Sequence, residues 1–337
     1  MELGNMLSDL KVAKILSTPS LEEWESKKRS IMSRWLQIIN ENSQLCKPLY
    51  EITDMAQEDG YVRKHLKYAT ADGEEVPALL LLPDAPAEKL PGILALHPTN
   101  ANGKNDIAHP SGRKDRQYGI ELVKKGYAVL APDTITAGER IEKGDEAFQT
   151  KNFYSRYPER TAVGKMLADH RQGAEVLASL KEVDQDRIGV IGHSLGGYNA
   201  YFLATLDQRI KAAVCSCGFS MFAGDPELHR WGKRDWFSHF PVISEWMERS
   251  EVPFDFHEIL SLCAPMPLFL WMGTNDPVFP HWKEGLKGII EVQKVYDVLG
   301  QNDSFEWVIG SSGHEFPPAI REHSFQFLDR HLKFTIH

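Results

Sequence analysis

The sequence predicts an α/β fold, with a mainly parallel, twisted sheet and helices on both of its faces. Short runs of consecutive apolar residues, such as residues 91–96 and 127–131, are typical of strands buried on both faces of a parallel sheet. Helix-compatible segments separate these runs, and such alternation indicates a parallel sheet that helices cover on both sides. The chain has 337 residues, which suits one large domain with added segments.

The first 60 residues are expected to be helical. Ser20 can accept a hydrogen bond at a helix N-terminus, and Glu23 three residues later can complete a capping box. An apolar stripe at three- to four-residue spacing follows, and it includes Ile31, Trp35 and Ile38. Because such a stripe must be covered, we expect an N-terminal helical segment, residues 1–60, to pack on a main domain, residues 61–337.

The main domain is expected to alternate strands and helices in chain order. Strands are expected at residues 61–68, 76–82, 91–96, 127–131, 187–191, 212–217, 267–272 and 305–309. Helices are expected at about residues 118–125, 161–181, 198–203, 280–299 and 317–332. The first two strands flank Asp72 and Gly73, which favour a turn.

An aromatic-rich interval, residues 219–260, interrupts this alternation and is too long for a simple connection. Its large aromatic residues are Phe222, Trp231, Trp236, Phe237, Phe240, Trp246, Phe254 and Phe256. One interpretation is a cap or lid over a substrate pocket, with Trp231, Trp236 and Phe237 as substrate-binding residues. The other is a helical insertion with a small core of its own, and the pattern does not choose between them.

The most informative motif is Gly-His-Ser-Leu-Gly-Gly at residues 192–197, between an apolar run and a helix-compatible run. A strand, sharp turn and helix in this order make Gly-x-Ser-x-Gly a nucleophile elbow. The glycines let the strand and the helix approach closely, since they lack Cβ atoms. The motif therefore predicts Ser194 as a nucleophile held at the edge of the sheet.

A serine nucleophile needs a base, and the base needs a group that orients it. His314 follows the last expected strand in a glycine-containing loop, and Asp276 follows the strand at residues 267–272. Both positions lie at the carboxyl edge of the sheet, where catalytic groups of open α/β folds gather. His314 is therefore the expected base and Asp276 its orienting carboxylate; Asp297 and Asp303 are weaker alternatives to Asp276.

The negative charge that develops on an attacked carbonyl needs hydrogen-bond donors. One expected donor is the backbone N–H of Leu195, directly after the nucleophile. The second should come from the loop after the strand at residues 91–96. Pro98 in that loop has no N–H, so Thr99 is the expected donor. His97, at the same strand end, is expected to shape the site and to contact substrate.

Taken together, these residues resemble the α/β-hydrolase superfamily, and within it the dienelactone-hydrolase-like and acetyl-xylan-esterase-like serine esterases. The resemblance extends from residue 61 to the C-terminus, and beside the serine motif it rests on residues 96–99, 131–133, 138–140, 186–189, 273–276 and 313–314. It implies an α/β-hydrolase fold and hydrolysis of carboxylic esters. Dienelactone hydrolases proper carry a cysteine nucleophile where this chain has Ser194, which favours ordinary esters.

Other functions remain open at this stage. The same triad could act on a thioester, a lactone or a peptide. A catalytically silent hydrolase fold that serves as a binding module is a further alternative, although such proteins usually lack a member of the triad. The aromatic residues of the insertion indicate an apolar pocket without defining the acyl or alcohol group.

Composition excludes several classes of partner. The net charge is −9 and no long basic run occurs, which argues against nucleic acid and anionic membranes. The four cysteines have no zinc-type spacing, so neither a metal nor a cofactor is expected. Cys215 and Cys217, two apart on an expected strand, should share one face.

The sequence also bears on location and assembly. No segment approaches the roughly 20 apolar residues of a membrane-spanning helix. The N-terminus has no basic stretch followed by an apolar run, so a cytoplasmic protein is expected. The amphipathic N-terminal helix could cover its own domain or a neighbouring copy, which leaves a homo-oligomer open.

Overall fold

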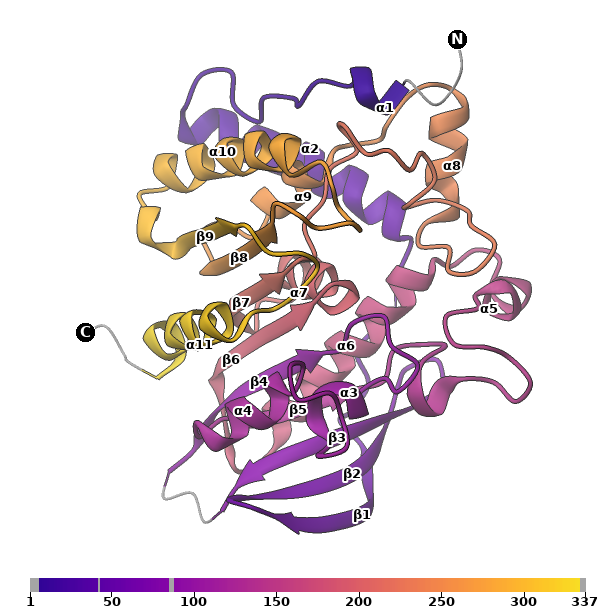
Figure 1. The fold of residues 1–337 in the computed structure, drawn as a ribbon, viewed down its shortest axis with the longest axis vertical. Helices are drawn as coiled ribbons and strands as arrows, with labels where there is room; N and C mark the ends of the chain where they lie inside the picture. Colours follow the sequence, from indigo (N-terminus) through magenta and orange to yellow (C-terminus); the bar gives the residue numbers. More distant parts are fainter. Residues whose placement is uncertain (1–5, 42, 85–87, 334–337) are drawn as a thin grey trace.

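The computed structural model describes residues 6–41, 43–84 and 88–333, and these residues form one sheet with helices on both faces (Figure 1). The sheet has nine strands in the order β1-β2-β3-β5-β4-β6-β7-β8-β9. In chain order, these are β1 (Tyr50–Glu58), β2 (Tyr61–Ala69), β3 (Glu75–Pro83), β4 (Leu90–Leu96), β5 (Ala128–Pro132), β6 (Val183–His193), β7 (Ile210–Ser216), β8 (Leu268–Gly273) and β9 (Phe305–Gly310). Pairing is antiparallel from β1 to β5 and parallel from β5 to β9, which confirms the predicted mainly parallel sheet.

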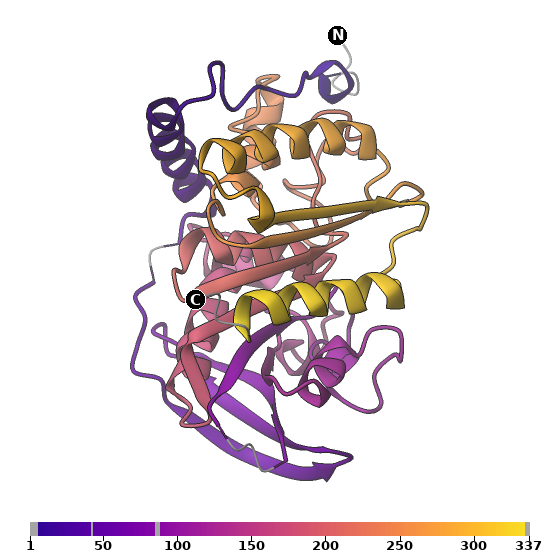
Figure 2. The ribbon, with the colours of Figure 1, turned by 90° about the vertical axis from the view of Figure 1, so that its left-hand side faces the viewer.

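Eleven α-helices lie in the described part of the chain. They are α1 (Met6–Asp9), α2 (Leu21–Ile39), α3 (Asn105–Ala108), α4 (Tyr118–Lys124), α5 (Lys151–Arg156), α6 (Ala162–Ser179), α7 (Leu195–Leu206), α8 (Pro241–Glu248), α9 (Phe256–Ser261), α10 (Trp282–Val298) and α11 (Pro318–Leu332). Helices α6, α7 and α10 cover one face of the sheet, and α3, α4 and α11 cover the other. Figure 2 shows β8 and β9 between the orange α10 and the yellow α11.

Strand side chains alternate between these two layers, as burial on both faces requires. In β8, Leu268 and Leu270 belong to the core beneath α10, whereas Phe269 and Trp271 belong to the core beneath α11. The continuous apolar run of β8 therefore serves two cores at once. This alternation fixes the position of the strand, and with it the loop that carries Asp276.

The helical prediction for residues 50–58 was wrong, because this segment is the edge strand β1. It pairs antiparallel with β2, from Tyr50 opposite Tyr68 to Glu58 opposite Tyr61. The side chains of β1 are mostly exposed, so the strand lacks the apolar alternation that would reveal it. Residues 1–5 and 42 of the predicted helical segment lie outside the described residues.

Helix α2 begins directly after Ser20, whose side chain accepts a hydrogen bond from the N–H of Glu23 at 3.2 Å. The Glu23 carboxylate accepts from the N–H groups of Ser17 and Thr18 instead of closing the box on Ser20. Ser20 is therefore the N-cap, as predicted. The predicted capping box does not form, because the Glu23 carboxylate binds N–H groups of the preceding loop.

The buried stripe of α2 packs against α7 and the aromatic interval. The Trp35 indole N–H donates to Thr205 Oγ1 at 3.0 Å, and its ring lies 4.7 Å from that of Phe202. Phe240 and Phe254 of the interval each place a ring 5.8 Å from Trp35. The N-terminal helix, α7 and the interval thus share a single core within one chain.

Cys215 and Cys217 do not share a face, contrary to the expectation from their spacing. Cys215 lies in the core layer of α7 and α10, and Cys217 lies in the layer of α11. Strand β7 ends at Ser216, and Cys217 has a left-handed φ of 43°, which breaks the alternation of strand side chains. The turn directs Cys217 to the carboxyl edge of the sheet.

Candidate active site

Ser194 lies between the end of β6 and the start of α7, in a strained backbone conformation with φ 55° and ψ −119°. A Cβ on Gly192 would lie 2.1 Å from the carbonyl oxygen of Gly196. A Cβ on Gly196 would lie 2.0 Å from the carbonyl oxygen of Leu96. Glycine is therefore required at both positions for β6 and α7 to meet at this sharp turn.

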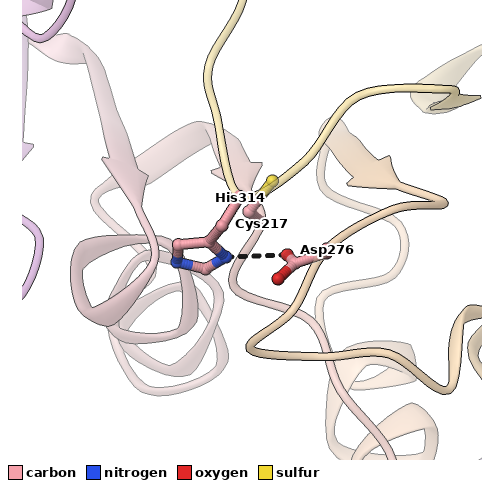
Figure 3. Close-up of side chains that lie close together, drawn as sticks. All are labelled: Cys217, Asp276 and His314. Atoms are coloured by element: carbon pink, nitrogen blue, oxygen red, sulfur yellow. Dashed lines mark hydrogen bonds and ion pairs between the residues drawn. The ribbon is translucent and has the colours of Figure 1, made fainter.

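The structure brings Ser194, His314 and Asp276 together at the carboxyl edge of the sheet. His314 Nε2 lies 2.8 Å from Ser194 Oγ, and His314 Nδ1 lies 2.7 Å from Asp276 Oδ2 (Figure 3 shows the second contact). A neutral imidazole has one donor and one acceptor nitrogen. With Nδ1–H donating to the carboxylate, Nε2 is free to accept the serine hydroxyl proton.

The environment of Asp276 keeps it ionised. Its side chain is almost fully buried, and burial by itself raises the pKa of a carboxyl group. The hydrogen bond and charge of His314 outweigh this, together with the N–H groups of Val278 at 2.7 Å and Phe279 at 3.1 Å. The pKa of Asp276 is therefore lowered below its ordinary value.

The alternative carboxylates lie elsewhere. Asp297 and Asp303 line a separate hollow between the end of α10 and the start of β9. That end of β9 is opposite the end that leads to His314, so neither carboxylate meets the imidazole.

Two backbone N–H groups are available beside Ser194. Leu195 is the first residue of α7, and Thr99 lines the same cavity as Ser194. Within the described residues, neither N–H donates to a backbone carbonyl. Both are thus free to donate to a group that enters the cavity, and the helix N-terminus adds a favourable dipole for negative charge.

His97 does not contact the cavity, so its expected role as a substrate contact was wrong. The side chain is fully buried, its Nδ1–H donates to the Pro98 carbonyl at 2.8 Å, and Nε2 accepts from the N–H of Thr134 at 3.1 Å. Burial lowers the pKa of His97 and keeps it neutral. It ties the loop that carries Thr99 to the loop after β5.

A narrow cavity of about 90 Å³ opens onto Ser194. Trp231, Trp236 and Phe237 of the interval line it, and substrate binding by them stays a prediction. Phe222, Phe240, Phe254 and Phe256 do not line the cavity and are buried in the core around α2 and α7, to which Trp231 and Phe237 also belong. The two interpretations of the interval therefore both describe it: its rings form part of the core, and Trp231, Trp236 and Phe237 also line the cavity.

Sequence reasoning missed further residues that line the cavity, namely Tyr198, Arg230, Arg234, His239, Val278 and Phe279. Tyr198 lies four residues after Ser194, one helical turn along α7, and this spacing was a usable signal. Phe279 follows Asp276 by three residues in the same loop. The two arginines and His239 come from the interval, where no spacing rule applied.

The two arginines of the cavity differ in how their charge is compensated. Arg230 donates to Asp225 through two nitrogens, at 2.7 and 3.0 Å. Arg234 donates to the Phe237 carbonyl at 3.1 Å, stacks over the Trp236 ring at 4.4 Å, and lies 3.7 Å from Glu227. Burial lowers the pKa of Arg234. Its guanidinium is therefore the less well neutralised cation in the wall of the cavity.

Cys217 lies beside Asp276 and His314, a position that no sequence pattern predicted (Figure 3). Its thiol donates to the carbonyl of Glu315 at 3.3 Å, and burial raises its pKa to about 12. The thiol is therefore neutral at physiological pH. Nothing in this arrangement requires a metal or a cofactor for chemistry at Ser194.

Comparisons with known proteins identify relatives of this chain and solved structures with a similar fold. The protein YtaP of Bacillus subtilis (strain 168) is 28% identical over 267 residues, which span 77% of this chain and 84% of YtaP. The carbohydrate esterase MZ0003, from an unknown prokaryotic organism, is 21% identical over 82% of this chain and 75% of its own length. A solved glucuronoyl esterase from Solibacter usitatus matches the fold with a TM-score of 0.72 at 18% identity, over 96% of this chain and 98% of that chain.

The structural match confirms the fold that the serine motif and its partners implied. The model of the dienelactone hydrolase family matches residues 76–299, which is more than half of the chain. In the described residues, no helix is both long and apolar enough to cross a membrane. The fold, the strained serine turn and the match to the family model lead to one conclusion: the chain belongs to the dienelactone hydrolase family.

Proposed function

We propose that this protein is a serine carboxylesterase that acts through a covalent acyl-enzyme. The observation that carries the proposal is the hydrogen-bonded series from Asp276 through His314 to Ser194, with contacts of 2.7 and 2.8 Å. Ser194 Oγ attacks the ester carbonyl carbon while His314 Nε2 takes the hydroxyl proton. Asp276 holds the ring in the required tautomer and stabilises the imidazolium that forms.

The free N–H groups of Leu195 and Thr99 would stabilise the oxyanion of the tetrahedral intermediate, and one such donor is typically worth about 3–4 kcal/mol. His314 then returns its proton to the departing alkoxide, and the alcohol leaves. A water molecule, deprotonated by the same imidazole, attacks the acyl-enzyme and releases the acid. Ser194 and neutral His314 are thereby restored.

The cavity favours a small ester. Its volume of about 90 Å³ and its wall of Trp231 and Phe237 leave room for a short acyl group. Arg234, with its incompletely neutralised charge, favours an oxygen-bearing or anionic part of the substrate on that side. The names of the relatives, a carbohydrate esterase and a glucuronoyl esterase, support oxygen-rich esters as the class to test first.

The alternatives differ in their chemistry. A thioester, lactone or peptide would use the same three residues, and substrate comparison separates them. A silent binding module would not need Ser194 in a strained turn with its hydroxyl 2.8 Å from an oriented imidazole. That strain is unfavourable unless the exposed hydroxyl is used, so the geometry favours an enzyme.

The decisive test combines covalent labelling with a substrate series. A fluorophosphonate probe should label the wild-type protein and fail to label Ser194→Ala. Nitrophenyl esters of increasing acyl length, run beside acetylated sugars, should give the highest kcat/KM with the shortest acyl groups. Well-folded protein that neither reacts with the probe nor cleaves any ester would favour the binding module.

A cytoplasmic location is part of the proposal. All four cysteines are free thiols, and three of them are buried. Free thiols suit a reducing compartment, where disulfides do not persist. Cell fractionation of the producing organism, followed by labelling with the same probe, would test it.

A further inference from the structure

Three different strand ends bring a thiol, an imidazole and a carboxylate to one place. Cys217 follows β7, Asp276 follows β8, and His314 lies in the loop after β9. The Cys217 sulfur, a ring nitrogen of His314 and a carboxylate oxygen of Asp276 all lie within 4.8 Å of one another (Figure 3). The esterase mechanism uses the second and third groups and leaves the thiol without a role.

This donor set matches the preference of one class of metal ion. Zn²⁺ binds thiolate sulfur at about 2.3 Å and imidazole nitrogen or carboxylate oxygen at about 2.0–2.2 Å, so donors around one ion lie about 3–4 Å apart. The three donor atoms lie within 4.8 Å of one another, and His314 Nδ1 and Asp276 Oδ2, now 2.7 Å apart, must separate slightly to admit an ion between them. Cd²⁺ shares the preference for sulfur, whereas Mg²⁺ and Ca²⁺ prefer oxygen ligands.

We propose that Cys217, His314 and Asp276 form an inhibitory site for Zn²⁺ and other thiol-preferring divalent cations. The inference rests on the proposed function, since inhibition requires an activity to be lost. An ion bound there would take no part in ester hydrolysis. It would switch the reaction off by occupying the side of His314 that faces Asp276.

The proton balance explains why such binding stops catalysis. The ion forms bonds to Cys217 Sγ, Asp276 Oδ2 and His314 Nδ1. The thiol proton goes to solvent, and the proton on Nδ1 moves to Nε2, so the net release is one proton. Nε2 then carries a hydrogen and donates to Ser194 Oγ instead of accepting from it, and the base is lost.

Burial places this site beneath the reactive face. The His314 side chain is 17% exposed, whereas the Asp276 side chain is 3% exposed and Cys217 is equally buried. The neutral thiol donates to the carbonyl of Glu315, which the same loop carries. The loop of His314 is therefore the element that an entering ion must displace.

The test compares wild type with Cys217→Ser and a matched control, Cys46→Ser, which removes a more exposed thiol outside the site. Hydrolysis of nitrophenyl acetate is measured against Zn²⁺ concentration, with each variant normalised to its own rate without metal. Cys217→Ser should raise the half-inhibiting Zn²⁺ concentration by roughly 10-fold or more, since loss of even an indirect partner of a metal ligand costs 10- to 100-fold. Cys46→Ser should match wild type.

A direct binding measurement separates this inference from the proposed function. Cd²⁺ should give an ultraviolet thiolate-to-metal charge-transfer band in wild type and in Ser194→Ala, and the band should be absent from Cys217→Ser. A band of this pattern in protein that cleaves no ester would support the metal site and reject the esterase. Equal Zn²⁺ inhibition of wild type and folded Cys217→Ser, or a band that survives Cys217→Ser, would overturn the metal site while leaving the esterase intact.

Discussion

The cavity at Ser194 has two walls that are built in different ways. On one side, Ser194, Asp276 and His314 each lie within four residues of the carboxyl end of a strand of the same sheet. On the other side, Trp231, Arg234 and Phe237 come from the irregular segment between β7 and α8. Strand pairing fixes the first wall, and aromatic packing against α7 and α2 fixes the second.

This difference indicates a division of labour. The sheet wall holds the atoms that would make and break bonds, and any ester needs the same arrangement there. The wall of the interval touches whatever the ester carries, so it would decide which ester is accepted. Changes on the sheet wall should therefore lower the rate for all substrates alike, and changes on the other wall should alter their ranking.

The largest effect is expected from Asp276→Asn on the sheet wall. An amide cannot hold His314 in the required tautomer, so kcat should fall by about 10⁴-fold. The order of preference within a nitrophenyl ester series should stay the same, because the opposite wall is untouched. Circular dichroism would check the fold, and a changed acyl preference would argue against separate roles for the two walls.

The next largest effect is expected from Trp231→Ala on the wall of the interval. Trp231 is fully buried and its ring packs 4.3 Å from Phe256 and 5.1 Å from Tyr198. Its removal should lower the free energy of unfolding by about 3–5 kcal/mol, measured by urea denaturation. The enlarged cavity should shift the preferred nitrophenyl ester to a longer acyl chain. If the order of kcat/KM over the ester series is unchanged, the Trp231 ring does not select the substrate.

A smaller effect should distinguish the two arginines of the same wall. Arg234→Gln should lower kcat/KM about 10-fold for an ester with a free carboxylate and leave a neutral ester of equal size nearly unchanged. Arg230→Gln should act on stability instead, because it leaves the buried Asp225 without its partner. Equal losses on both esters with Arg234→Gln would mean that its charge does not contact substrate.

The smallest effect concerns acid stability and compares two buried aspartates, Asp276 of the sheet wall and Asp255 of the aromatic interval. The pKa of Asp276 is lowered, mainly by His314 against the opposing effect of burial. The pKa of Asp255, which caps α9, is raised because burial outweighs the charge of His257 and the N–H groups of Phe222, Ala223 and Phe256. Protonation of Asp276 should therefore lower the free energy of unfolding, and protonation of Asp255 should raise it.

The sign follows from linkage between proton binding and folding. Asp276 contributes stability above its ordinary pKa of 3.8 and loses it as the pH falls below that value. Asp255 destabilises the fold in its ionised form, and that penalty declines as the pH falls through its raised pKa. Urea denaturation between pH 7 and 3 gives the free energy of unfolding of wild type and of Asp276→Asn. The difference between the two free energies should narrow only below about pH 4. A difference that narrows already near pH 6 would contradict the lowered pKa of Asp276.

Much of the fold and the triad could be predicted from the sequence because the signals were local. The apolar runs of β4, β5 and β8 are long enough to mark strands buried on both faces. Residues that follow such strands must gather at one edge of a parallel sheet, which is why Ser194, Asp276 and His314 could be named before their distances were known.

Other features depended on contacts that no local pattern encodes. Edge strand β1 has exposed side chains and is held by its pairing with β2, so its sequence resembles a polar helix or loop. His97 has the right position for a site residue, but its nitrogens are taken up by Pro98 and Thr134. Arg234 and Cys217 reach the site through irregular backbone, whose direction follows from packing.

By itself, the sequence determined the mainly parallel sheet, the serine turn and the chain order of nucleophile, acid and base. Only the tertiary structure decided which aromatic residues of the interval wall the cavity, which arginine remains incompletely paired, and that a thiol lies beside the proposed base. The physical reason is that strand periodicity and glycine geometry act over a few residues, whereas burial, charge pairing and side-chain contact depend on segments that are distant along the chain.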